Sequence, residues 1–478
     1  MIGKKIVDTN GKEYTIVKQF YISTYNSVYG LECGAVAKFV NDTDRDDFIK
    51  KVHSRMSGDF NKAAGVVVPI AVLEAPYTGY ILPKLSNSIV LEDRLRYDGE
   101  IEFNDWFNKK TGGILERIHV GISLARCLRT FHERGYVLSN LSPENILIQP
   151  FTNEVVLFCI EDLIKPNEFD GSDIRYAKYV APELREHFRM PSSLSDVYSY
   201  AVILFELLRR GHPFVGEQSL DDKDKAYRGK YPYIDDPNDE SNRQDGLEFT
   251  QHLITDPLRG LFERTFCEGL LNAYERPTLS EYIEVLEASL DIIRHCGNLE
   301  CQSGFFVADK HKNRCIWCQE EDDITFLEFY ETVSVSDYKI VDSKNLSGIK
   351  DFVHENKVVN TMVLNNDIVF LKNKHFDPMI TNNRNKEVLK IEKLDEINYA
   401  ISKRSNSIPL YMHEPKLGLV KMEEKTEYVF KKGVTAILYP TNYNVSENMA
   451  LDMSILNEFY NVNDNENGLQ LRSYVKIL

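Results

Sequence analysis

The sequence predicts an α+β fold in which a small β-rich lobe is followed by a larger helical lobe. Residues 12–40 alternate between apolar and polar side chains, which is typical of half-buried strands. From Gly113 onward the apolar residues recur at helical spacing instead, and this pattern predicts amphipathic helices. Short strand-like segments separated by Asn-rich turns return over residues 325–478. The chain therefore changes from strand to helix and back, and more than one domain is expected.

Each predicted part rests on its own elements. Further strands are expected at GVVVPIAVL and GYILPKL in the first lobe, and further helices at SDVYSYAVILFELLRR, near Pro257 and at SEYIEVLEASLDII in the second. Four cysteines then cluster before the final strand-like region. The expected parts are an N-terminal lobe over 1–86, a C-terminal lobe over 87–294, a cysteine knuckle over 295–320 and a C-terminal domain of unknown function over 321–478.

The composition, the N-terminal segment and the cysteine pattern favour a cytoplasmic protein. The net charge of −16 argues against general binding to nucleic-acid phosphates or to anionic membranes. The N-terminal segment has no apolar core of the kind found in secretory signals, and the longest apolar runs are too short to span a bilayer. Eight cysteines over this length do not form the pattern of a secreted disulfide framework.

Five short motifs occur in a fixed order in the first part of the chain. They are AVAK at 35–38, LSNLSPENIL at 138–147, YVAPE at 179–183, DVYS at 196–199 and RPT at 276–278. Each motif alone is bland, since V-A-K is usually a strand and A-P-E a turn before a helix. Together, in this order, they resemble the protein-kinase fold over roughly residues 12–292. The resemblance implies a bilobal protein-kinase-like fold.

The resemblance also assigns expected roles to single residues. Lys38 corresponds to the lysine that holds the α and β phosphates of ATP. Val28, Ala37 and Leu147 correspond to the apolar residues that enclose adenine. Two further matches are structural: Asp196 is expected to cap the backbone of the loop at 138–147, and Arg276 is expected to pair with Glu183.

Several catalytic residues of the kinase pattern are replaced. The three glycine positions of the phosphate-binding loop hold Tyr21, Ser23 and Asn26, whose side chains obstruct close approach of phosphates to the backbone. The window at 53–57, where a helical Glu should pair with Lys38, holds no acid. Lys38 is therefore expected to be unpaired or paired unusually, and the alternative is a solvent-facing strand lysine.

The proton acceptor and the metal ligand are also replaced. Asn140 occupies the general-base position, and a neutral amide cannot accept a proton from a substrate hydroxyl. Cys159 aligns with the primary Mg²⁺ ligand, and a soft thiol suits Mg²⁺ poorly. Asn145, the second metal ligand of the pattern, is present. Glu161 or Asp162 could reach a metal only if the backbone were shifted.

Two functions remain open at this point. The first is a pseudokinase that acts as a signalling or scaffold module, with weak or no nucleotide binding. The alternative is an enzyme, a divergent ATP-dependent Ser/Thr protein kinase or another nucleotide transferase. The simultaneous loss of the base and the metal ligand favours the first hypothesis.

A narrower resemblance concerns the partners. The segments GYILPKL at 79–85, RRGHPFVG at 209–216 and CIWC at 315–318 are similar to those of a bacterial branch of kinase-like proteins. These proteins are encoded beside a metal-dependent Ser/Thr phosphatase and a von Willebrand A protein of the tellurite-resistance type. The resemblance implies protein partners of these two kinds. By analogy, the C-terminal domain is expected to recognise a partner.

The cysteine knuckle predicts a structural zinc site. Cys296, Cys301, Cys315 and Cys318 form two close pairs separated by a short loop, as in tetrahedral Zn–S₄ sites. Four protein ligands leave no open coordination position, so the role should be structural. The alternatives are a set of free thiols, or a site in which His295 or His311 replaces one cysteine. Nucleic-acid binding through such a knuckle is disfavoured by the acidic composition.

Overall fold

The computed structural model describes most of the chain. The residues outside the description are 42–43, 58–64, 86–87, 139, 166–176, 187–188, 245–247, 302–303, 309–313, 322–323, 332–356, 365–367, 377–379, 381, 415–417, 433–435, 441–470 and 478. The chain divides into two compact units, one formed by 1–290 with 302–307 and the other by 291–301 with 308–478. Among the described residues, no helix combines the length and the apolar character needed to cross a membrane.

The first lobe of unit one is an antiparallel sheet of six strands in the order β1-β2-β3-β4-β6-β5. The strands are β1 (Lys5–Val7), β2 (Glu13–Ile22), β3 (Asn26–Leu31), β4 (Val36–Val40), β5 (Ala71–Val72) and β6 (Gly79–Leu82). A single described helix, α1 (Arg45–Met56), lies between β4 and β5 in the sequence. Asp44 caps this helix, because its carboxylate accepts a hydrogen bond from the Asp47 amide at 2.9 Å.

The close pairing of β4 with β6 depends on Gly79. A Cβ atom at this position would lie 2.2 Å from the carbonyl oxygen of Lys38, so that any larger residue would push the strands apart. In the resulting register Lys38 lies opposite Tyr80. This pairing fixes the position of the lysine predicted to bind phosphate.

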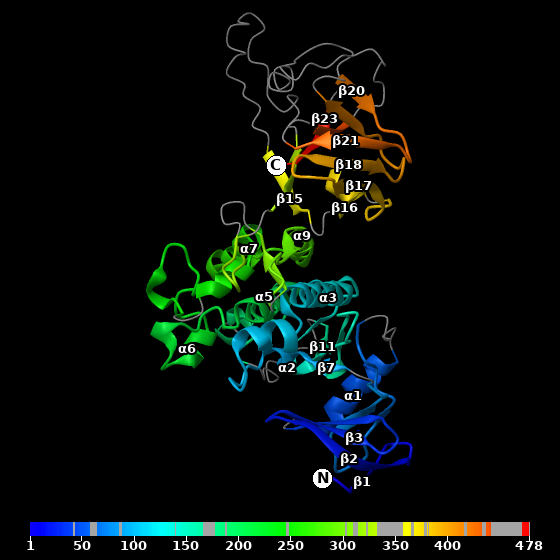
Figure 1. Cartoon of the computed structure of the whole chain (residues 1–478). Helices are drawn as coiled ribbons and strands as arrows, with labels where there is room; N and C mark the ends of the chain where they lie inside the picture. The colour runs from blue at the N-terminus through cyan, green and yellow to red at the C-terminus, as the bar shows by residue number, and fades with distance from the viewer. Residues whose placement is uncertain are drawn as a thin grey trace, which may run out of the picture. The chain divides into compact units, whose positions relative to one another are not determined.

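The second lobe of unit one is mainly helical (Figure 1). Its α-helices are α2 (Leu91–Leu95), α3 (Gly113–Glu133), α4 (Pro182–Glu186), α5 (Ser193–Arg209), α6 (Lys223–Tyr227), α7 (Asp256–Glu263), α8 (Gly269–Leu271) and α9 (Leu279–Leu290). Helix α3 packs against α5 and α9, and Gly121 permits this approach, because a Cβ there would lie 2.7 Å from Leu204.

Short strands and helical turns carry the candidate site residues of this lobe. The strands form two small sheets, β10-β9-β7 and β11-β8, with bounds β7 (Ile89–Val90), β8 (Val137–Leu138), β9 (Ile146–Ile148), β10 (Val155–Leu157) and β11 (Leu163–Ile164). The 3-10 turns are Pro143–Asn145, Ile160–Asp162, Glu217–Ser219, Glu240–Asn242, Glu248–Leu253 and Ala273–Glu275, and the π-helical turns are Asp105–Lys110 and Arg264–Glu268.

The second unit contains two antiparallel sheets that share one apolar core. The first has the order β15-β14-β23-β22-β19-β20 and the second the order β16-β17-β18-β21. Leu327, Met412 and Val475 of the first sheet belong to the same buried cluster as Ile391, Ile401 and Phe430 of the second. The remaining elements are β12 (Ile293–His295) and α10 (Asn373–Phe376), and β13 (Phe305–Val307) belongs to unit one.

The bounds of the strands in these two sheets are as follows: β14 (Phe326–Glu331), β15 (Lys357–Val363), β16 (Ile368–Lys372), β17 (Glu387–Lys393), β18 (Asn398–Lys403), β19 (Tyr411–Glu414), β20 (Gly418–Lys421), β21 (Glu427–Lys431), β22 (Ala436–Pro440) and β23 (Leu471–Ile477).

Candidate functional site

Lys38 is buried on β4, an inner strand of the sheet in the first lobe. Every residue of its strand β4 is buried, and Lys38 itself is 1% exposed. The alternative of a solvent-facing strand lysine is therefore wrong. A strand whose two faces are both covered leaves a lysine no route to water, so its ammonium group must find partners inside the protein.

Glu161 supplies the main partner of this ammonium group. The Nζ atom of Lys38 lies 2.9 Å from Oε1 of Glu161, and both side chains are 3% exposed or less. The hydroxyl of Tyr80 donates to the other oxygen, Oε2, at 2.6 Å. Burial opposes ionisation of Glu161, but the charge of Lys38 and the hydrogen bonds from Tyr80 and Lys38 outweigh it and lower the pKa of this carboxyl. The expected unusual pairing of Lys38 is thus present, with an acid from the turn after β10.

Helix α1 presents a cation where the kinase pattern has an acid. Arg55 is 3% exposed, and its Nε donates to the carbonyl oxygen of Leu163 at 2.8 Å. Its guanidinium group also lies over the ring of Tyr136, 5.2 Å from the centroid. A second buried cation cannot neutralise Lys38, and this explains why the helix does not supply the partner of the lysine.

The three residues expected to enclose adenine are all buried and apolar. Val28 is 7% exposed, Ala37 0% and Leu147 4%. Val28 and Ala37 lie on the paired strands β3 and β4, and Leu147 lies on β9. Their role in nucleotide binding stays a prediction.

The turn between β2 and β3 uses its own backbone amides. The amides of Tyr25 and Asn26 donate to the hydroxyl of Ser23 at 3.3 Å and 3.2 Å. These N–H groups, which a phosphate-binding loop would direct at its ligand, already have an acceptor. Tyr21, at the first glycine position, hydrogen-bonds to Glu144 of the Pro143–Asn145 turn; burial and this contact raise the pKa of Tyr21. The contact between Tyr21 and Glu144 therefore connects the end of β2 to the Pro143–Asn145 turn.

Asn140 and Asn145, at the expected base and second metal-ligand positions, share Asp162 as a hydrogen-bond partner. The amide nitrogens of Asn140 and Asn145 each lie 3.3 Å from an oxygen of Asp162, and all three side chains are about 1% exposed. Cys159 is fully buried, and burial raises the pKa of its thiol well above the usual value. A protonated, buried thiol is not a ligand for Mg²⁺. Cys159, at the expected primary metal position, therefore does not fit the Mg²⁺ ion that phosphoryl transfer in the kinase pattern uses.

The structural contacts of the motif pattern are confirmed. Arg276 forms a two-pronged ion pair with Glu183, with nitrogen–oxygen distances of 2.7 Å and 2.8 Å. Asp196 accepts a hydrogen bond from the Leu138 amide at 3.1 Å, and His132 lies 2.8 Å from the same carboxylate. The framework of the second lobe is thus intact around a loop that lacks its acid.

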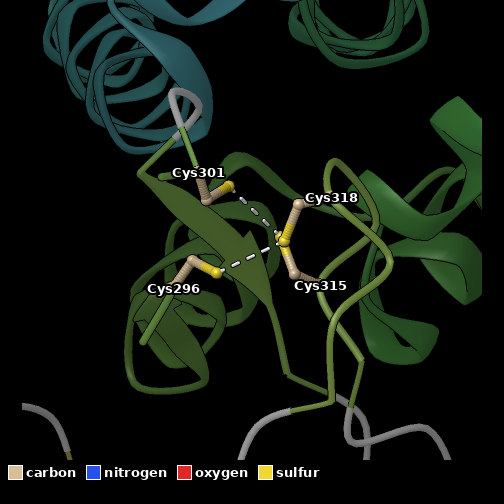
Figure 2. Close-up of side chains that lie close together, drawn as sticks. All are labelled: Cys296, Cys301, Cys315 and Cys318. Carbon is tan, nitrogen blue, oxygen red and sulfur yellow. Dashed lines mark hydrogen bonds between the residues drawn. The ribbon is translucent and has the colours of Figure 1, made fainter. Parts of the chain in front are cut away.

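The four cysteines of the knuckle converge on one point in unit two (Figure 2). Their sulfur atoms all lie within 4.8 Å of one another, with 3.7 Å between Cys296 and Cys318 and 3.9 Å between Cys301 and Cys315. Sulfurs held about 2.3 Å from a central Zn²⁺ lie about 3.8 Å apart at the corners of a tetrahedron. These distances are too long for disulfides and they fit a metal site.

Of the two histidines considered as replacement ligands, the structure describes only His295. The ring nitrogen Nδ1 of His295 lies 2.9 Å from the backbone oxygen of Cys296, and His295 is not part of the four-residue cluster. His311 lies outside the described residues. Among the residues that the structure describes, the candidate metal centre consists of the four cysteines.

Sequence reasoning missed two members of the Lys38 network. The sequence gives no indication of a functional role for Tyr80, because a tyrosine in an apolar strand is usually interpreted as a core residue. Glu161 was considered only as a distant metal ligand. A search for any acid near the end of β10 could have found it, since that segment approaches β4 in this fold.

Comparisons with known proteins agree with the motif order. Residues 35–241 match the family model described as "Protein tyrosine and serine/threonine kinase". A "Probable inactive receptor kinase" of Arabidopsis thaliana is 34% identical over 100 residues, which are 20% of this chain and 10% of the relative. The "Serine/threonine-protein kinase mos" of Patiria pectinifera is 28% identical over 109 residues, which are 21% of this chain and 31% of the relative. The chain thus spans less than a third of the length of either relative.

A solved structure of vaccinia related kinase 3 is also similar to this chain. The TM-score is 0.43 at 16% sequence identity, and the match covers 61% of this chain and 92% of the other.

Proposed function

Starting from a chain that contains a protein-kinase-like domain, we propose that this domain is a pseudokinase that serves as a signalling or scaffold module. The observation that carries the proposal is the buried ion pair between Lys38 and Glu161. Together with the carbonyl oxygen of Phe158 and Oδ1 of Asn145, this pair occupies all three donors of the lysine that the kinase pattern assigns to the phosphates. With Asn140 at the base position and buried Cys159 at the metal position, the groups that phosphoryl transfer needs are missing together.

One observation favours the alternative of a divergent kinase or nucleotide transferase. The carboxylate of Asp162 accepts hydrogen bonds from the side-chain amides of both Asn140 and Asn145. A rearranged loop could bring this acid towards a substrate hydroxyl. The pseudokinase is preferred because such a loop would still lack a free lysine.

Transfer of radiolabelled phosphate from ATP tests the choice. The full chain is incubated with labelled ATP, with Mg²⁺ or Mn²⁺, and with candidate partner proteins, and a Lys38→Ala variant serves as the control. The proposal predicts no incorporation above that of Lys38→Ala. Incorporation that depends on Lys38 would replace it with the divergent enzyme.

The cysteine cluster is proposed to hold one structural Zn²⁺. Burial and the neighbouring sulfurs raise the pKa of Cys296, and they raise that of Cys315 to about 11. Four sulfurs this close are stable as thiolates only around a cation, and this supports a metal rather than free thiols. Because all four positions are filled by protein ligands, the ion would stabilise the fold and would not take part in a reaction.

The partners proposed for the module are proteins. The resemblance to the bacterial branch suggests a metal-dependent phosphatase and a von Willebrand A protein, and a cytoplasmic location accords with thiolate ligation. Co-purification of the tagged full chain with each candidate, at matched expression levels, tests this assignment. Retention of neither protein would refute it.

A further inference from the structure

We propose that Glu161 and Tyr80 form an internal lock on Lys38 that excludes phosphate-bearing ligands from the nucleotide site. The proposal rests on the pseudokinase function and names the residues that control ligand access. It predicts that the site discriminates against ATP and tolerates the uncharged nucleoside. Glu161 is then a specificity-determining residue of the site.

The donors of Lys38 are fully used. An ammonium group has three N–H donors and no acceptor. Its three acceptors are Oε1 of Glu161 at 2.9 Å, the carbonyl oxygen of Phe158 at 3.2 Å and Oδ1 of Asn145 at 3.3 Å. A phosphate oxygen can bind Lys38 only by displacing one of them.

The acid that would have to move is itself anchored. Tyr80 donates to Glu161 at 2.6 Å, and burial followed by the charge of Glu161 raises the pKa of this phenol well above its usual value, so it stays a donor. The Tyr80 ring stacks on Phe48 of α1, with 6.0 Å between centroids and an interplanar angle of 3°. Tyr80 also lies opposite Lys38 in the β4–β6 register. Strand, helix and turn therefore hold the acid together.

The lock also acts through charge. A carboxylate 2.9 Å from Nζ of Lys38 offsets its charge in a region that water does not reach, and Phe158 and Asn145 take the donors that a lysine paired with a single acid would keep for phosphates. An incoming triphosphate would meet this carboxylate and would be repelled by it. A nucleoside carries no charge, so its binding depends on apolar residues such as Val28, Ala37 and Leu147 and not on the lock.

The test compares ATP with adenosine, without metal, by calorimetry on the full chain. Glu161→Gln keeps the shape of the side chain and removes its charge. A hydrogen bond to a charged group is worth roughly a 10- to 100-fold change in affinity. ATP should therefore bind Glu161→Gln more tightly than wild type by roughly that factor, with adenosine unchanged. The gain should vanish in the double variant Lys38→Met/Glu161→Gln.

The lobe offers a matched control. Tyr14 donates to Asp8 at 2.9 Å, and both residues are buried on the β1–β2 hairpin. Asp8→Asn removes a buried acid of the same kind, and it should change neither affinity. If melting curves show that Glu161→Gln is unfolded, Tyr80→Phe replaces it, with a smaller gain in ATP affinity expected and Tyr14→Phe as its control.

Two results would overturn the lock. One is an ATP affinity that is unchanged in Glu161→Gln or Tyr80→Phe. The other is a wild-type chain that already prefers ATP over adenosine through Lys38. Neither result depends on phosphate transfer. The binding measurements therefore test the lock, and the incorporation of labelled phosphate separately tests the pseudokinase function.

Discussion

Replacing Arg276 with alanine should destabilise the first unit strongly. The side chain is fully buried and makes two bonds to Glu183, one to the carbonyl of Gly269 and one to the carbonyl of Leu194. Its guanidinium also lies over the ring of Tyr198 at 5.1 Å. Alanine leaves the Glu183 carboxylate and two carbonyl oxygens without these donors. Breaking a buried pair in this way costs about 3–5 kcal/mol.

Thermal unfolding of the full chain measures this cost against a matched exposed pair. The control is Arg264→Ala, which breaks the ion pair of Arg264 with Glu281 at 2.7 Å; both side chains are about 40% exposed. Exposed pairs are worth about 1 kcal/mol or less. For a unit of this size 1 kcal/mol corresponds to about 2–4 °C, so Arg276→Ala should lower the Tm by roughly 6–20 °C. Equal shifts for Arg276→Ala and Arg264→Ala would refute the reasoning.

Three further predictions concern metal, pH and catalysis. Elemental analysis of protein purified without added metal should find about one Zn²⁺ per chain, and Cys315→Ser should lose it; a folded, metal-free wild type would refute the site. Burial and the charge of Lys178 lower the pKa of His212 to about 3 in the folded chain. Between about pH 6.5 and pH 3 this histidine is therefore protonated in the unfolded chain and neutral in the folded one. The free energy of unfolding should fall by up to about 1.4 kcal/mol for each pH unit as the pH is lowered through this range. Chemical denaturation at several pH values should give a shallower slope for His212→Gln, and an unchanged slope would exclude this histidine as the cause. Asn140→Asp alone should not give phosphate transfer, because Cys159 still occupies the metal position; labelled product from this single variant would contradict the account.

The sequence predicted those contacts that follow from motif spacing. The Glu183–Arg276 pair and the convergence of four cysteines could be predicted, because the residue types and their spacing in the sequence are typical of these contacts. The partner of Lys38 could not be found in this way, because the expected position was a window on the next helix. That window holds Arg55, whose charge excludes it. Glu161 comes from a distant turn, and only the packing of β4 against the segment after β10 brings it to Lys38.

The burial of Lys38 also could not be predicted from the neighbouring residues in the sequence. A lysine in an apolar strand fits a solvent-facing edge as well as a buried centre. The fold decides between them, because β4 pairs with β3 and β6 on its two sides, and the ammonium group of Lys38 contacts Asn145, Phe158 and Glu161. The packing of β4 against segments distant in the sequence therefore determines which groups reach the ammonium ion.

The dependence of ATP binding on Mg²⁺ tests most directly the central claim that the fold is retained without its metal-dependent machinery. Calorimetry compares ATP affinity for the full chain with and without Mg²⁺, for wild type and for Asn145→Ala. Because Cys159 is buried and Asn145 is engaged by Lys38 and Asp162, the account predicts weak or no binding that Mg²⁺ does not strengthen. Affinity that rises about tenfold or more with Mg²⁺, and loses this gain in Asn145→Ala, would contradict it.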